Sequence, residues 1–157
     1  MNNIITREIK PEEYYLLEDF LYEAIFIPKG YNKPSRDIIN NKELQVYIKD
    51  FGKKDDNCIV ALIDNKIVGA CWTRIMNDYG HIDDSIPSLA ISLYEEYRGK
   101  GIGTKLIEEM LKLLKEKMHK KVSLSVQKEN YAVNMYKKTG FKIVDETEEE
   151  YIMVCDL

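Results

Sequence analysis

The sequence has few of the residues that support disulfide or metal chemistry. It contains three cysteines and two histidines among 157 residues, and Cys58, Cys71 and Cys155 form no C-x-x-C pair. Each cysteine lies in an apolar run, which is typical of a buried, reduced thiol rather than of a disulfide or a zinc ligand. We therefore expect no disulfide and no metal site.

A large excess of one charge is also missing, as is a long hydrophobic run. The 23 basic and 27 acidic residues leave a formal net charge of −4, so no strong field favours nucleic acid or an anionic membrane. No segment approaches the roughly 18 apolar residues of a membrane span, and the N-terminal MNNIITREIK lacks the apolar core of a secretion signal. We expect a cytoplasmic monomer or homodimer that binds neither nucleic acid nor membrane.

The pattern of apolar residues predicts one domain, spanning residues 1–157, in which strands and helices are mixed. No internal repeat and no linker rich in glycine, proline or serine divides the chain. Alternation and β-branched runs predict strands, while helical spacing and capping residues predict helices. The expected strands are 3–9, a hairpin within 57–75, 88–94, 121–126, and the runs FKIV and YIMVCDL at the end; the expected helices start at Pro11, span 38–51, start near Ile102, and lie between Asn130 and Gly140.

Three glycines at alternate positions open the helix near Ile102, in the stretch YRGKGIGTKL at 97–106. A strand followed by a helix brings unsatisfied N–H groups and the positive helix end together, where an anion can bind. Glycines at 99, 101 and 103 carry no Cβ to block its approach, and Arg98, Lys100 and Thr104 add charge and a hydroxyl.

Other interpretations of this stretch are weaker. A tight turn needs one glycine rather than three. A Walker A loop requires G-x-x-x-x-G-K-[ST], but here threonine precedes lysine after Gly103. A dinucleotide fingerprint requires G-x-G-x-x-G, whereas these glycines run G-x-G-x-G without a second βαβ half.

The stretch resembles the pyrophosphate-binding motif [RQ]-x-x-G-x-[GA] of the GNAT superfamily of N-acetyltransferases, with Arg98, Gly101 and Gly103 at the defining positions. A second stretch, ENYAVNMYKKTGF at 129–141, is similar to the family's N-x-A-V-x-x-Y-x-x-x-G-F segment. The resemblance implies an α/β fold with a mixed sheet of six to seven strands, flanked by about four helices, in which the fourth strand bulges and the fourth and fifth strands splay apart.

The resemblance also implies acetyl-CoA as cosubstrate and assigns residues to it. The pyrophosphate would contact residues 98–104, that is Arg98, Gly99, Lys100, Gly101, Ile102, Gly103 and Thr104; the pantetheine would lie along Ile91, Ser92 and Leu93; Asn130 and Tyr136 would lie near the cofactor. The Leu93 N–H would stabilise the oxyanion, and the Tyr136 hydroxyl would assist thiolate departure. A packing role for Tyr136 competes with this, because Tyr136 and Phe141 are spaced for the apolar contact of a Schellman cap.

The acceptor side is less defined. Some family members carry a glutamate base where this chain has Ser125, so His81, Asp83 and Asp84 are our candidate replacements, although they also suit a polar turn. Tyr31, in a loop rich in glycine and proline, is a candidate for the acceptor pocket. The expected function is acetyl transfer to a primary amine of a small molecule or peptide; a non-catalytic acyl-CoA-binding module and a nucleotide-binding protein are the alternatives.

Overall fold

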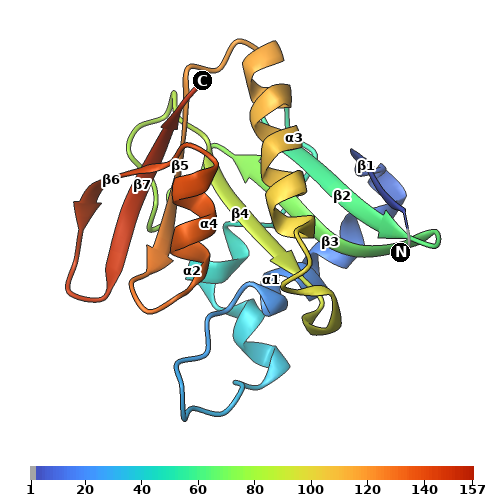
Figure 1. Cartoon of the computed structure of the whole chain (residues 1–157), viewed down its shortest axis with the longest axis horizontal. Coiled ribbons are helices and arrows are strands. Elements are labelled where there is room, and N and C mark those ends of the chain that lie inside the picture. Colours follow the sequence, from blue (N-terminus) through green and yellow to red (C-terminus); the bar gives the residue numbers. More distant parts are fainter. Residues whose placement is uncertain (1–2) are drawn as a thin grey trace.

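The computed structural model describes residues 3–157, which form a seven-stranded sheet covered by helices on both faces (Figure 1). The strand order is β1-β2-β3-β4-β5-β7-β6, with every neighbouring pair antiparallel except β4 and β5. The strands are β1 Ile4–Glu8, β2 Asn57–Ile63, β3 Lys66–Arg74, β4 Ser88–Leu93, β5 Lys121–Gln127, β6 Lys142–Glu146 and β7 Glu150–Asp156. The mixed sheet and the element order agree with the prediction.

The helices divide between the two faces. They are α1 Leu17–Glu23, α2 Lys42–Gln45, α3 Ile102–Glu116 and α4 Ala132–Lys138, with 3-10 turns η1 Pro11–Leu16, η2 Arg36–Asn40 and η3 Glu95–Tyr97. Figure 1 shows α3 and α4 in front of the sheet. The core on their face includes Leu106, Met110 and Tyr136, whereas Leu17 and Phe20 of α1 pack with Trp72 in a second cluster. Because side chains alternate along a strand, the two clusters lie on opposite faces of the sheet.

Strands β4 and β5 separate immediately after their first contact. Their only paired residues in the described chain are Ser88 and Ser123, so the rest of this edge of β4 has no strand partner. The predicted splay is therefore present. The predicted bulge in β4 is wrong, because β4 pairs with β3 in unbroken register from Ser88 to Leu93. The antiparallel ladder to β3 holds β4 straight, and the gap opens on the β5 side alone.

The predicted helix over 38–51 is also wrong in extent. Only η2 and the short helix α2 form there. The buried Arg74 guanidinium donates to the Val46 and Lys49 carbonyl oxygens at 3.2 and 2.9 Å, and Asp50 adopts a positive φ of 54°. These carbonyl oxygens, which a longer helix would use for its own hydrogen bonds, thus bind Arg74 instead. The tertiary contact overrides the local helix propensity.

All three cysteines are free and buried, as expected. Across residues 3–157, no helix combines the length and the apolar character that crossing a membrane would require.

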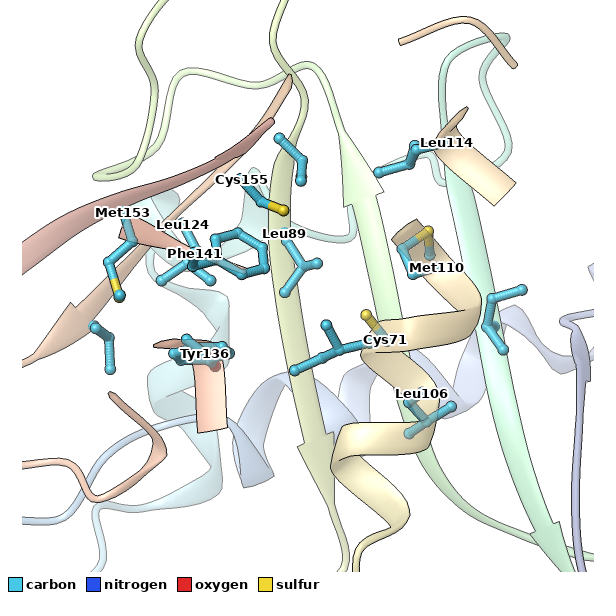
Figure 2. Packing of buried hydrophobic residues seen from close by; sticks show 14 of the residues in the cluster. Cys71, Leu89, Leu106, Met110, Leu114, Leu124, Tyr136, Phe141, Met153 and Cys155 are labelled. Atoms are coloured by element: carbon cyan, nitrogen blue, oxygen red, sulfur yellow. The ribbon is translucent and has the colours of Figure 1, made fainter. Parts of the chain in front are cut away.

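The C-terminal end of α4 is a Schellman cap, as its spacing predicts. Phe141 N–H donates to the Tyr136 oxygen at 3.0 Å, and Gly140 N–H donates to the Lys137 oxygen at 3.2 Å. The Tyr136 and Phe141 rings meet edge to face at a centroid distance of 5.8 Å. Figure 2 shows the two rings near each other, to the left of β4 in this view, with α3 to the right, and both belong to the core cluster that α3 covers.

Replacing Gly140 by alanine should destabilise the protein by more than the same change at Gly30. Both glycines have positive φ, 111° and 88°, which costs an L-residue about 1–2 kcal/mol. A Cβ on Gly140 would also approach Cys155 Sγ to 3.3 Å, while a Cβ on Gly30 would meet nothing within 4 Å. Urea unfolding of both variants measures the difference, and equal losses would show that the contact with Cys155 carries no cost.

Candidate active site

The start of α3 presents a row of free backbone amides. In the described chain, the N–H groups of residues 99–104 donate to no backbone oxygen, and the first main-chain bond of the helix entry runs from Lys105 N–H to the Gly101 oxygen at 3.2 Å. Gly99 and Gly101 have positive φ of 73° and 83°, and a Cβ on either would meet no atom within 4 Å. The backbone at Gly99 and Gly101 therefore borders open space, which is the arrangement that a phosphate group requires.

Gly103 differs from the other two glycines. A Cβ there would lie 3.1 Å from Met135 Sδ of α4 and 3.8 Å from Ile91 Cδ1 of β4. The missing side chain thus lets α3 and α4 pack closely, so our explanation that it clears the way for an anion is wrong for this glycine. Its backbone amide remains among the free ones.

Arg98 is engaged with the protein itself. Its Nε donates to the Leu93 oxygen at 3.1 Å, and its Nη2 reaches Glu23 Oε1 at 3.0 Å. The side chain therefore ties the end of β4 to α1. Lys100 lies nearby with its Nζ 5.9 Å from the centre of the Tyr97 ring, and Thr104 is half-buried in the first turn of α3.

The free edge of β4 continues from this row of amides. Tyr94 N–H donates to the Val68 oxygen at 3.0 Å, and hydrogen-bonded pairs alternate along an antiparallel ladder. Ile91 and Leu93 therefore turn their backbone groups away from β3, toward the gap beside β5. Ser92 faces β3 instead, and its hydroxyl donates to the Phe20 oxygen at 2.6 Å.

Tyr136 is on the buried face of α4, in the core and close to Cys71. Its hydroxyl donates to no group within residues 3–157. Burial, followed by the nearby Cys71, raises the pKa of the phenol well above its ordinary value. A raised pKa keeps the phenol protonated, which favours hydrogen-bond donation and makes complete proton transfer to a thiolate less favourable.

The N-cap of α4 is Tyr131 rather than the predicted Asn130, which lies one residue earlier. The Asn130 Oδ1 accepts from Ala132 N–H at 2.9 Å, a turn that leads into the helix. The amide nitrogen of the same side chain makes no hydrogen bond within the part of the chain that the structure describes.

The candidate bases lie together in the loop before β4. Asp83 Oδ1 accepts from the Ser85 hydroxyl and, at 2.7 Å, from the Ser85 N–H. These bonds, the hydroxyl bond first, make a polar turn and lower the pKa of this exposed carboxyl. His81 Nε2 lies 3.4 Å from Asp84, whose side chain is 95% exposed, and the buried His81 Nδ1 has no hydrogen-bond partner in the described residues. Tyr31 is 73% exposed on its loop.

Three polar residues that no sequence motif marks lie together where β4 begins. Tyr47 donates its hydroxyl to Asp78 Oδ2 at 3.0 Å, and Ser88 donates to Asp78 Oδ1 at 2.7 Å. No motif marks them, because Tyr47 follows α2 and Asp78 lies in a loop. Only the hydrogen bonds across the fold reveal the group.

A surface cavity of about 560 Å³ lies elsewhere, between the C-terminal part of α3 and the end of β7, where Lys112, Lys115 and Cys155 contribute to its wall. It does not coincide with the row of amides or with the gap beside β4.

Known proteins share this architecture. The PaiA N-acetyltransferase of Thermoplasma acidophilum, solved with coenzyme A, superposes with a TM-score of 0.73 and 23% identity over 99% of both chains. A streptothricin acetyltransferase, described as putative, from Bacillus anthracis, solved with acetyl coenzyme A, gives a TM-score of 0.70 and 18% identity over 99% of both chains. These similarities show the shared fold.

A curated relative is closer in sequence. An N-alpha-acetyltransferase of Saccharolobus solfataricus is 35% identical over 107 residues, which make up 62% of this chain and 62% of the relative. The alignment therefore spans less than two thirds of that protein. The model of the acetyltransferase (GNAT) family matches residues 17–141, a range that includes the free amides, the edge of β4 and α4. The chain belongs to the GNAT acetyltransferase family.

Proposed function

We propose that the protein is an acetyl-CoA-dependent N-acetyltransferase whose acceptor is the α-amine of a peptide. The observation that carries the proposal is the continuity between the free amides of residues 99–104 and the unpaired edge of β4. Amides at a helix start suit a pyrophosphate, and an unpaired strand edge suits an extended chain with amide groups, such as pantetheine. The family match and the coenzyme-bound neighbours support the choice of ligand.

The residues of the chain divide the work between binding and chemistry. Acetyl-CoA supplies the acetyl group as a thioester. The amides of residues 99–104 hold the phosphates, and Leu93, the β4 residue nearest to them, positions the pantetheine through its N–H group. The thioester at the far end of the pantetheine then lies beside Ile91, so the Ile91 N–H, rather than the Leu93 N–H expected from the sequence, stabilises negative charge that develops on the carbonyl oxygen. The Tyr136 hydroxyl donates a hydrogen bond to the sulfur.

The relatives named N-alpha-acetyltransferase support an α-amine as acceptor. A free α-amine has a pKa of about 7.7–8.0, compared with about 10.4 for lysine. At pH 7 the neutral form therefore costs about 1 kcal/mol for the α-amine and about 4.6 kcal/mol for the lysine amine. An active site without a strong base therefore favours an α-amine over a lysine amine as acceptor.

Replacing Tyr136 by phenylalanine should lower kcat by about 10- to 100-fold, because a hydrogen bond to a charged group contributes about 1.5–3 kcal/mol. The edge-to-face contact with Phe141 does not use the hydroxyl, so the melting temperature should hold. Because the phenol pKa is raised, deprotonation of Tyr136 should not reduce wild-type kcat up to about pH 10, the ordinary tyrosine value. An unchanged kcat in the variant would show that the Tyr136 hydroxyl takes no part in the reaction.

Two measurements test the proposed function. Thermal unfolding should shift upward with coenzyme A but not with ATP or NAD. Thiol release from acetyl-CoA should then occur with peptides that have a free N-terminus and not with the same peptides blocked by acetylation. Binding without thiol release for any peptide, polyamine, amino acid or aminoglycoside would support the non-catalytic alternative instead.

A further inference from the structure

The vertex of the gap between β4 and β5 carries a carboxylate to which the reaction outlined above gives no role. Ser88 is the β4 residue that pairs with β5, and its hydroxyl donates to Asp78 at 2.7 Å. The Tyr47 hydroxyl holds the other oxygen of the same carboxylate at 3.0 Å. Asp78 therefore lies at the point where the two strands begin to separate.

Close packing of the loop holds Asp78 in place. Two residues further on, a Cβ on Gly80 would lie 3.0 Å from the backbone of Leu124 and Ser125, so the loop lies flat against β5. The Ser123 hydroxyl donates to the Gly80 oxygen at 2.7 Å. The position of the carboxylate is thus set by the sheet itself.

Asp78 and Tyr136 approach the gap from opposite faces of the sheet. Ser88 shares its face of β4 with Ser92, whose hydroxyl contacts α1, and Tyr47 follows α2. Tyr136 belongs to the core on the α3 side. The incoming nitrogen and the departing sulfur occupy different corners of the tetrahedral intermediate, so Asp78 and Tyr136 can each serve one of them.

The carboxylate has capacity for a further ligand. Its two oxygens offer about four acceptor positions, of which the two hydroxyls take two, and Asp78 is partly exposed. The surroundings are negative rather than neutral. Burial first, and then the charges of Asp78 and Glu150, raise the pKa of Tyr47, and burial raises the pKa of Glu150 itself.

We propose that Asp78 binds the amino group of the acceptor and accepts its proton during transfer, with Tyr47 and Ser88 as positioning residues; this rests on the proposed function. As the nitrogen–carbon bond forms, the nitrogen becomes positive and its N–H acidic. That proton moves to a carboxylate oxygen of Asp78 and then to water, while the carbon–sulfur bond breaks and the electron pair leaves on sulfur. Asp78 thereby binds the transition state more strongly than the neutral amine.

The test compares Asp78→Asn with Asp55→Asn, which removes the same charge from an exposed position outside the candidate site. Asp78→Asn should lower kcat/KM for the acceptor peptide by about 30- to 1000-fold, which is within the range of general base catalysis and charge-assisted binding. It should weaken calorimetric binding of that peptide to the protein saturated with coenzyme A. Binding of coenzyme A itself, and all values for Asp55→Asn, should stay within about twofold of wild type.

Each outcome decides between the claims. If the wild type shows no thiol release with any amine, the proposed function fails whatever Asp78 does. If the wild type is active and Asp78→Asn matches Asp55→Asn in kcat/KM and peptide binding, the assignment of Asp78 is overturned while the function stands. Tyr47→Phe keeps the ring and removes one hydrogen bond to the carboxylate, so it should lower kcat/KM in the wild type but not further in the Asp78→Asn background. An equal loss in both backgrounds would contradict its positioning role.

Discussion

Replacing Arg74 by alanine is expected to lower the free energy of unfolding by about 3–5 kcal/mol, because it leaves a buried carboxylate without its partner. The Arg74 guanidinium binds both oxygens of Asp56, at 3.2 and 3.0 Å, and the two side chains are only 5% and 4% exposed. The same guanidinium also holds the Val46 and Lys49 carbonyls. Urea unfolding followed by circular dichroism measures the loss.

Arg7 provides the matched control. It also pairs with a carboxylate through two bonds of 2.8 Å, to Glu13, but its side chain is 30% exposed. Solvent screens such a pair, so Arg7→Ala should cost about 1 kcal/mol or less. An Arg74→Ala loss no larger than that of Arg7→Ala would mean that burial does not strengthen the Arg74 pair.

Replacing Gly101 by valine should raise the dissociation constant for coenzyme A by about 100-fold or more, equal to about 2.7 kcal/mol. Gly101 precedes α3 with a φ of 83°, which a β-branched residue avoids. Its side chain would also project into the open space beside the free amides. Isothermal titration calorimetry with coenzyme A measures the change.

Gly30→Val separates the lost site from general backbone strain. Gly30 has a φ of 88°, and a Cβ there would meet no atom within 4 Å. Its valine variant therefore has similar backbone strain, at a position far from α3 in the sequence. It should bind coenzyme A as the wild type does. If both variants bound coenzyme A equally weakly, the cause would be lost stability rather than a blocked phosphate site.

Local patterns were sufficient for most of the fold. Apolar spacing predicts α3, alternation predicts the strands, and the hairpin turn is marked by Asp64 and Asn65, which adopt φ of 50° and 64° as a two-residue turn requires. The Schellman cap at Gly140 follows from spacing alone. The apolar spacing over 38–51 predicts too long a helix, because contacts with Arg74 decide how far that helix extends.

The sequence by itself determined the order of the elements, the glycine-rich start of α3 and the family, since each depends on residues close together in the chain. Only the tertiary structure decided that β4 runs unbulged beside β3, that Gly103 serves the packing of Met135, and that Asp78 meets Tyr47 and Ser88. These features join residues that are distant along the chain. Their distances depend on how the sheet and helices pack, which no local pattern encodes.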